Sequence, residues 1–209
     1  ELRNRDGPYG SVAELMERTG LLQKSLENLA DAGALDSLSG DRRAVRWEIG
    51  LRYRPVNRQL ALSLPVEQDT IDLEPLSAWE RMEEEYRTMG LHPAGHIMAY
   101  LREQLGPDVI TSTEVAGLED GTRVTVAGLV IRRQRPLAKA VYVTLEDECG
   151  HTPLVLWPKT YERYRQVFRE PLVITSGYVS RREGTMNVVV MGARAMPTFE
   201  VAPKSKDWS

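Results

Sequence analysis

The spacing of apolar residues predicts helices in the first half of the chain. The runs SVAELMERTGLL, SLENLADAGALDSL and DRRAVRWEIGLR, all of which begin within residues 11–50, repeat apolar residues at helical intervals. Ser11 and Asp41 stand where N-caps are expected, and Glu14 follows Ser11 as in a capping box. A further helix is expected to begin at Ser77 in SAWERMEEEYRTMGL, and a shorter one lies in GHIMAYLREQLG.

The sequence pattern of the second half predicts β-strands. Five β-rich runs follow residue 109, namely TRVTVAGLVIRR, AVYVTLED, TPLVLWP, PLVITSGYVSRR and TMNVVVMGARAM. KTYERYRQVFRE, between the third and fourth runs, has helical spacing. Five short strands with one helix between strands three and four is the order of an OB-fold barrel. Gly128 and Gly177 fall inside these strands, where barrel corners or bulges need glycine.

A helical hairpin precedes the strands. One helix ends near Gly33, Ala34 and Leu35, and the next begins after Asp41, which resembles a helix-hairpin-helix. Such hairpins present backbone N–H groups to a phosphate, and neighbouring arginines can add contacts. The alternative is that Gly33 only caps a helix. The candidate DNA-contacting residues of the hairpin are Gly33, Ala34, Leu35, Arg42 and Arg43.

The predicted architecture is α+β, with an N-terminal helical helix-hairpin-helix region joined by a linker and helices to a five-stranded OB-fold β-barrel. Three prolines and the loss of helical period mark the linker. The expected segments are the helix-hairpin-helix region (1–54), the linker (55–76), connecting helices (77–106), the OB-fold (107–198) and a C-terminal tail (199–209).

Charge is distributed unevenly along the chain. The formal net charge is −3, yet residues 121–209 carry 14 basic and 8 acidic side chains. The first 120 residues carry 13 basic and 22 acidic side chains. Such asymmetry suggests a polyanion partner for the basic half, although an unevenly charged solvated surface gives the same counts.

Composition narrows the class of protein. The chain is 42% apolar and 27% charged, as globular proteins are, and no run of 18 apolar residues could span a membrane. Cys149 is the single cysteine, so neither an internal disulfide nor a cysteine-based zinc site can form. We expect a reducing, cytoplasmic setting. Because the chain starts at Glu1 rather than at a methionine, we expect a fragment of a longer protein.

A leucine-rich peptide lies in the predicted linker. In QLALSLP the three leucines alternate, so an extended segment would carry them on one face. They either pack on this chain's own helices or dock in an apolar pocket of a partner, with the glutamine fixing the register. The candidate docking residues are Gln59, Leu60, Leu62 and Leu64.

The barrel carries the strongest candidate site. From 121 to 139 the chain has five basic residues and no acidic one. A basic groove with aromatic rings is what single-strand binding requires, since cations pair with phosphates and bases stack on rings. Tyr142 and Trp157, taken singly, could equally be core or rim residues. The candidate DNA-contacting residues of the barrel are Arg132, Arg133, Arg135, Lys139, Tyr142, Trp157, Lys159, Arg181 and Arg182.

No catalytic constellation stands out. His92 and His96 are four residues apart, but Pro93 lies between them and breaks a common helical face. The run Glu146-Asp147-Glu148 is expected to be a solvated turn. We therefore expect no catalytic residue, no metal site and no cofactor in this chain.

Five motifs together resemble a known family. LENLADAGALDSLSGDRRA, GLHPAGHIMAYLR, VAGLVIRRQRP, VTLEDECG and VLWPKTYERYR resemble the C-terminal region of bacterial family-C DNA polymerases, the polymerase III alpha subunits. RRQRP followed by TLEDE is most similar to the error-prone paralogue. Two features depart from that pattern: Ile97 stands where the paralogue has proline, and the turn after RRQRP is shorter and lacks a glycine.

The resemblance implies a DNA-binding part of an error-prone polymerase active in translesion synthesis and DNA repair. It implies that the hairpin contacts duplex DNA, that the barrel lies near the single-stranded template, and that Gln59 to Leu64 docks on the β sliding clamp. Other proteins of a mutagenesis complex are further implied partners. The palm domain with its catalytic aspartates and Mg²⁺ would precede Glu1, so this chain alone would not polymerise DNA.

Three alternatives stay open on the sequence. The first is the same region of the replicative alpha subunit, which would continue into a further domain. The second is an RNA-binding OB-fold module, such as the anticodon-binding domain of a tRNA synthetase. The third is an OB domain that binds only protein.

Overall fold

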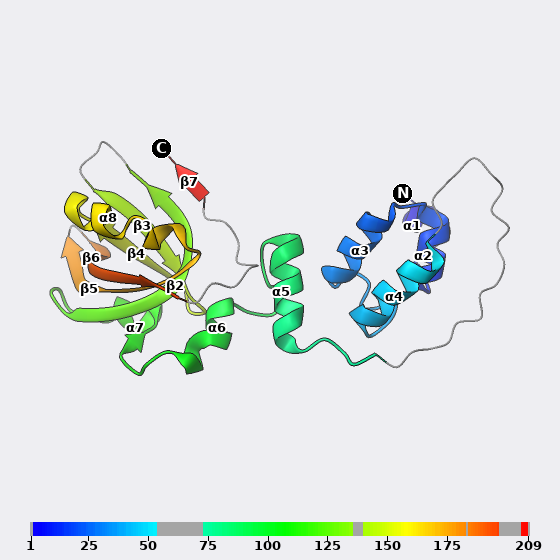
Figure 1. The fold of residues 1–209 in the computed structure, drawn as a ribbon, viewed down its shortest axis with the longest axis horizontal. Helices are drawn as coiled ribbons and strands as arrows, with labels where there is room; N and C mark the ends of the chain where they lie inside the picture. The colour runs from blue at the N-terminus through cyan, green and yellow to red at the C-terminus, as the bar shows by residue number, and fades with distance from the viewer. Residues whose placement is uncertain (1, 54–72, 136–139, 183, 197–205, 209) are drawn as a thin grey trace. The chain divides into compact units, whose positions relative to one another are not determined.

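The chain divides into two compact units, Glu1–Met89 and Gly90–Ser209 (Figure 1). Each unit has its own buried core. This computed structural model describes residues 2–53, 73–135, 140–182, 184–196 and 206–208, the last three by their backbone.

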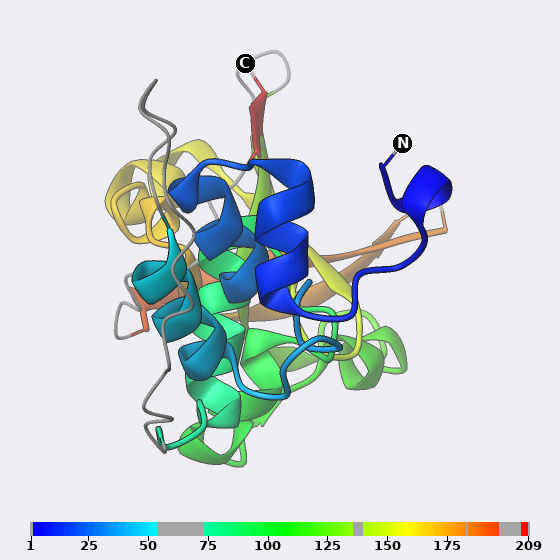
Figure 2. The ribbon, with the colours of Figure 1, turned by 90° about the vertical axis from the view of Figure 1, so that its right-hand side faces the viewer.

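Helices make up the first unit (Figure 2). They are α1 (Leu2–Asp6), α2 (Val12–Thr19), α3 (Gln23–Asp31), α4 (Arg42–Arg52) and α5 (Ala78–Met89). The predicted N-caps are confirmed: Ser11 accepts the N–H of Glu14 at 3.1 Å, and Asp41 accepts the N–H of Arg43 at 3.0 Å. The apolar faces of α2, α3 and α4 meet in a core that includes Leu26.

The turn after α3 is a Schellman motif. Gly33 has a φ of 74°, in the left-handed region that favours glycine. Its N–H bonds the carbonyl of Ala30, and the N–H of Ala34 bonds the carbonyl of Leu29, both at 2.9 Å. These two bonds satisfy carbonyls that the end of α3 would otherwise leave without partners. Gly33 therefore caps α3, the alternative that the sequence left open.

The second unit begins with short elements: α6 (Ile97–Leu101), the 3₁₀ turn η1 (Arg102–Gln104), β1 (Val109–Ile110) and α7 (Ser112–Ala116). The barrel strands follow: β2 (Arg123–Gln134), β3 (Val141–Glu146), β4 (His151–Leu156), β5 (Leu172–Arg182) and β6 (Thr185–Ala195). Between β4 and β5 lie α8 (Pro158–Tyr164) and η3 (Val167–Arg169), and β7 (Lys206–Trp208) is the C-terminal strand. The predicted segment 77–106 is thus divided, with α5 in the first unit and α6 in the second.

The barrel is a closed OB-fold, as predicted. The strands follow the order β2-β3-β4-β6-β5, and β5 pairs back to β2. The pair β4–β6 is parallel, and the other barrel pairs are antiparallel. Inward side chains such as Val143, Leu154 and Phe168 fill the core. Gly177 lies at a bulge between β5 and β6, where a Cβ atom would collide with the backbone of Val189.

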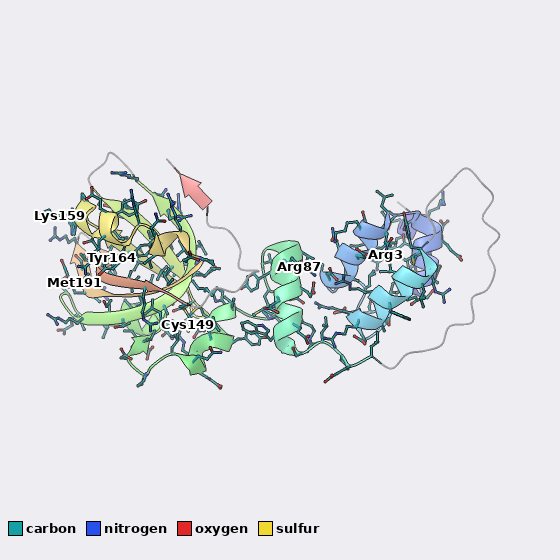
Figure 3. The ribbon with its side chains drawn as sticks, in the orientation of Figure 1. Arg3, Arg87, Cys149, Lys159, Tyr164 and Met191 are labelled. Atoms are coloured by element: carbon teal, nitrogen blue, oxygen red, sulfur yellow. The ribbon has the colours of Figure 1, made fainter. Side chains whose placement is uncertain are left out.

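The acidic run after β3 is not the solvated turn that the sequence suggested. Asp147 is buried and accepts the N–H and the hydroxyl of Ser112, both at 2.6 Å. It also accepts the N–H groups of Cys149 and Gly150, at 2.8 and 2.9 Å. The carboxylate therefore ties the β3–β4 turn to the start of α7. Cys149, which is labelled in Figure 3, lies in that turn.

Arg102 adds a second tie to the same turn. Its guanidinium holds Glu148 through two hydrogen bonds of 2.7 and 2.9 Å. The hydrogen bonds to Glu148 raise the pKa of Arg102, against the opposing effect of burial. The ion pair joins η1 to the barrel.

Candidate nucleic-acid interface

Strand pairing places one row of residues on the outside of the barrel. Gln134 of β2 lies opposite Tyr142 of β3, which lies opposite Val155 of β4. Val155 lies opposite Val189 of β6, and Val189 lies opposite Tyr178 of β5. Their neighbours along β3, β4 and β6 fill the core, so these positions face outward. We call these five positions the outer row.

The outer row combines exposed rings with an apolar strip. Tyr142 is 42% exposed and Tyr178 is 36% exposed, whereas Val155 and Val189 are nearly covered in a small cluster with Ala140. Trp157, two residues beyond Val155, is 51% exposed at the start of α8. Exposed aromatic faces beside an apolar strip are suited to stacking against bases.

The sequence singled out two of these aromatic residues and missed the third. Tyr142 and Trp157 are on the surface, not in the core. Tyr178 was missed because its place beside Val189 depends on strand order and on the bulge next to it. The alternation of residues in VITSGYVS was the only signal for its outward position.

The arginines after β2's apolar stretch have different roles. Arg132 is exposed beside Gln134 of the outer row. Arg133 is half-buried and donates to the carbonyl of Phe168 at 2.5 Å, which ties β2 to η3. Arg135 is exposed, with its guanidinium carbon 5.9 Å from the ring centroid of Tyr161. Arg132 and Arg135 are therefore displayed to solvent, whereas Arg133 braces the barrel.

The other basic residues predicted to contact DNA also include both bracing and exposed side chains. Arg181 donates to the carbonyls of Leu118, at 2.9 Å, and of Ala116, so it holds the loop after α7. Arg182 is exposed at the end of β5, and Lys159 is exposed on α8 (Figure 3). Lys139 lies outside the described residues, as do Gln59, Leu60, Leu62 and Leu64 of the predicted clamp peptide.

Arg42 of the hairpin is a structural residue, contrary to the predicted phosphate contact. Its side chain is 9% exposed and lies between carboxylates of Asp36 and Glu85, at 2.9 and 2.7 Å. It also donates to the carbonyl of Asp31 at 3.2 Å. Burial disfavours the charged guanidinium, but the hydrogen bonds to Asp36 and Glu85 prevail and raise the pKa of Arg42.

The remaining hairpin residues also have partners inside the first unit. The N–H groups of Gly33 and Ala34 cap α3, and Leu35 is buried in the core. Arg43 donates to Glu80 at 2.6 Å and to the carbonyl of Glu74 at 2.8 Å.

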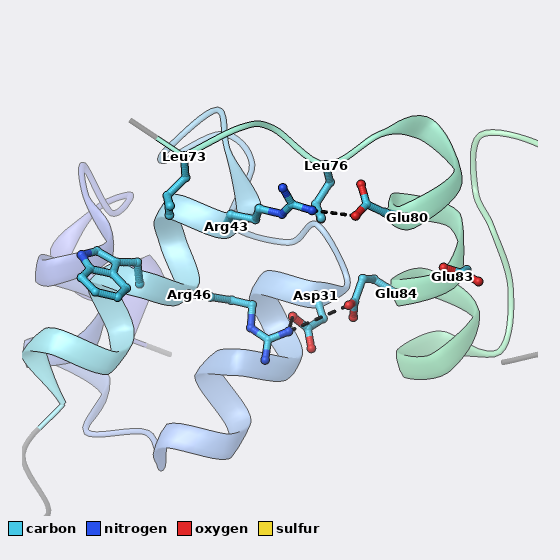
Figure 4. A pocket seen from close by; sticks show the side chains of 9 residues that line it. Asp31, Arg43, Arg46, Leu73, Leu76, Glu80, Glu83 and Glu84 are labelled. Atoms are coloured by element: carbon cyan, nitrogen blue, oxygen red, sulfur yellow. Dashed lines mark hydrogen bonds and ion pairs between the residues drawn. The ribbon is translucent and has the colours of Figure 1, made fainter. Parts of the chain in front are cut away.

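A shallow pocket of the first unit lies beside these contacts. In Figure 4, Arg43 points to Glu80, and Arg46 points to Asp31 and Glu84. Both arginines that line this pocket are thus already paired within the unit.

Neither a metal centre nor a membrane segment is found in the described residues. No group of three or more histidine, cysteine, aspartate or glutamate side chains there is arranged to hold a metal ion. His96 caps α6 and His151 pairs with Glu146. None of the helices in those ranges is long and apolar enough to cross a bilayer.

Known protein families match both parts of the chain. Residues 124–194 match a family model described as an OB-fold nucleic acid binding domain, and residues 1–45 match a helix-hairpin-helix motif. The chain is 41% identical over 204 residues to a protein named error-prone DNA polymerase from Anaeromyxobacter dehalogenans. The chain is a homologue of one region of the error-prone DNA polymerases. The order of a helix-hairpin-helix followed by an OB-fold fits the predicted C-terminal region of these polymerases.

The relatives are much longer than the matched region. The match to the Anaeromyxobacter protein takes in 90% of this chain but 18% of that protein. A protein named error-prone DNA polymerase 1 from Rhizobium meliloti is 35% identical over 192 residues, which is 87% of this chain and 17% of that protein. The chain therefore spans less than a fifth of the length of these curated relatives.

The chain also has a distant likeness to a solved structure. Asparaginyl-tRNA synthetase from Pyrococcus horikoshii matches 45% of this chain and 23% of its own, with 24% identity and a TM-score of 0.38. At this TM-score the likeness implies nothing about function.

Proposed function

We propose that this chain is the DNA-binding part of an error-prone DNA polymerase, and that it holds single-stranded DNA on the outer row of its barrel. The observation that supports this best is the placement of Tyr142 and Tyr178 on one outward surface, with Arg132 displayed beside it. Rings that stack with bases and cations that attract phosphates give sequence-tolerant binding. Such binding suits an enzyme that must accept damaged template.

DNA then binds to the barrel alone. In the helical unit, the guanidinium groups of Arg42 and Arg43 and the N–H groups of Gly33 and Ala34 already have protein partners. Duplex binding by the hairpin would require these contacts to be exchanged for phosphate contacts.

Tyr142→Ala tests the stacking surface. We expect the affinity for a labelled oligo-dT, measured by fluorescence anisotropy, to fall by about 1–3 kcal/mol because one stacked base loses its partner. Trp47→Ala is a matched control, since Trp47 is an exposed aromatic residue of the first unit. Equal affinity of Tyr142→Ala and the unaltered protein would refute the proposal.

We also propose that Gln59 to Leu64 tethers the polymerase to its sliding clamp. The support is the sequence alone, QLALSL, with leucines at alternate positions. Replacing both Leu62 and Leu64 by alanine should abolish co-elution with the β clamp in gel filtration, while DNA binding stays unchanged. Retained co-elution would show that these leucines have another role.

A further inference from the structure

A groove crosses the outside of the barrel where the outer row ends. Arg123 of β2 lies opposite Tyr178 of β5, and two positions further along β2 Thr125 lies opposite Ser176. Two adjoining hollows, of about 410 and 210 Å³, share Thr125 and Ser176 in their linings. Together they make one groove over β2, β5 and β6, which begins beside Tyr178 because Arg123 lines the larger hollow. We call it the lateral groove.

The backbone of β6 shapes the lateral groove. The pairing of β5 with β6 is irregular between Ser176 and Gly177, which leaves Met191 without a residue opposite it. The side chain of Met191, labelled in Figure 3, is 61% exposed and lines the larger hollow. Gly192 lines the smaller hollow, and a Cβ atom there would lie 2.8 Å from the hydroxyl of Ser176. The absence of a side chain at position 192 therefore keeps the groove open.

The lining carries an excess of positive charge. Arg123 lines the larger hollow and Arg194 the smaller one, and both are exposed. Within the described ranges neither forms an ion pair with a carboxylate, whereas Arg43 and Arg46, in the pocket of the first unit, are both paired. Asp108 is the single acidic residue among the described lining residues. The groove is therefore suited to an anionic ligand.

We propose that the lateral groove binds the sugar-phosphate backbone of the same DNA strand whose bases stack on the outer row. The inference rests on the proposed function and deepens it, because the groove continues the binding surface beyond Tyr178. Arg123 and Arg194 pair with phosphates of the strand, one in each hollow. The hydroxyls of Thr125 and Ser176 lie between them and can donate to phosphate or sugar oxygens.

A peptide of a partner protein is the alternative occupant. Met191 and Ile174 give the groove apolar contacts that a peptide could use. A peptide held by these contacts gives no role to Arg123 and Arg194, which would stay without anionic partners. It also predicts that loss of both arginines leaves DNA binding unchanged.

The test removes both arginines, as Arg123→Gln with Arg194→Gln, in the full 209-residue chain. Oligo-dT anisotropy should show weaker binding at low salt, because two phosphate contacts are lost. The slope of log affinity against log salt should flatten by about 1.4, twice the value of about 0.7 for one phosphate contact on a single strand. An unchanged affinity and slope overturns the inference and favours the peptide.

A matched control separates local contacts from overall charge. Arg3→Gln with Arg81→Gln removes the same charge from exposed positions of the first unit and should keep the slope. Equal flattening by this control pair would mean that net charge alone attracts the DNA, and it too would overturn the inference.

A second measurement locates the DNA directly. p-Benzoylphenylalanine in place of Met191 should cross-link to bound oligo-dT on irradiation, whereas in place of Leu22, an exposed residue of the first unit, it should not. Absence of a cross-link at position 191 under saturating DNA contradicts the proposed path. If the unaltered protein fails to bind oligo-dT, the proposed function falls and this inference falls with it. If Tyr142→Ala weakens binding and loss of the two arginines does not, the inference alone falls.

Discussion

Two adjacent arginines of β2 have different surroundings. Arg132 is exposed beside the outer row, whereas Arg133 turns to the carbonyl of Phe168. The cause is an irregularity in register between Val130 and Arg132 in the β2–β3 pairing. Simple alternation from the buried Val130 would place Arg132 on the inner side, but the irregularity carries it to the outer side with Gln134.

Substitutions at these two arginines should separate binding from stability. Arg132→Gln is expected to flatten the slope of log affinity against log salt by about 0.7, the value for one phosphate contact on a single strand. Its midpoint of urea unfolding should stay the same. Arg133→Gln should lower that midpoint, because the Phe168 carbonyl loses its donor, by about 1–3 kcal/mol in free energy. The reverse pattern would mean that Arg133 is the residue that meets DNA.

At the scale of elements, His96 connects α6 to the barrel. Its Nδ1 accepts the N–H of Met98 at 3.1 Å, so the ring caps the helix in its neutral form. Burial lowers the pKa of His96, although the nearby carboxylates of Glu146, Glu148 and Asp147 oppose this. Protonation would also place a second N–H against the Met98 donor.

The stability of the second unit should therefore depend on pH through His96. The unfolded chain binds a proton near pH 6.5 and the folded one only at lower pH, so the free energy of unfolding falls as pH drops below about 6.5. His96→Asn keeps an N-cap acceptor and removes the titration, so urea unfolding between pH 7.5 and 5.5 should vary less. Identical slopes in the unaltered protein and in His96→Asn would exclude His96 as the cause.

Elements with a clear apolar period were predictable, and those without one were not. Helices α2 to α5 repeat apolar residues over about two turns, and the barrel strands alternate apolar and polar residues several times. The order of these elements was therefore enough to predict the OB-fold. β1 and β7 have two and three residues, too few for any period. Buried polar contacts such as Asp147 with Ser112 join positions 35 residues apart, and no local pattern announces them.

At the scale of the whole molecule, the excess negative charge lies in the first unit, whereas the proposed DNA-binding surface lies in the second. Residues 1–89 carry 12 basic and 17 acidic side chains, whereas residues 90–209 carry 15 basic and 13 acidic ones. The outer row lies entirely in the second unit, which has its own core. The acidic unit therefore opposes the attraction of the barrel for a polyanion.

The second unit alone should bind single-stranded DNA at least as well as the whole chain. We expect residues 90–209, expressed separately, to bind oligo-dT more tightly than the full chain at low salt, because the repelling acidic unit is absent. The difference should vanish at high salt, where charges are screened. Weaker binding by a folded fragment, with folding checked by circular dichroism, would show that the helical unit contributes contacts of its own.

The double pairing of β2 has a consequence for how the protein is made. β2 needs β3, which follows it closely, and also β5, which is synthesised only after β4 and α8. The helices of the first unit pack against neighbours that emerge early, so they can fold while synthesis continues. The apolar stretch of β2 instead lacks one of its two partner strands until β5 has been synthesised. We therefore expect the barrel to fold more slowly than the helical unit and to be more prone to aggregation.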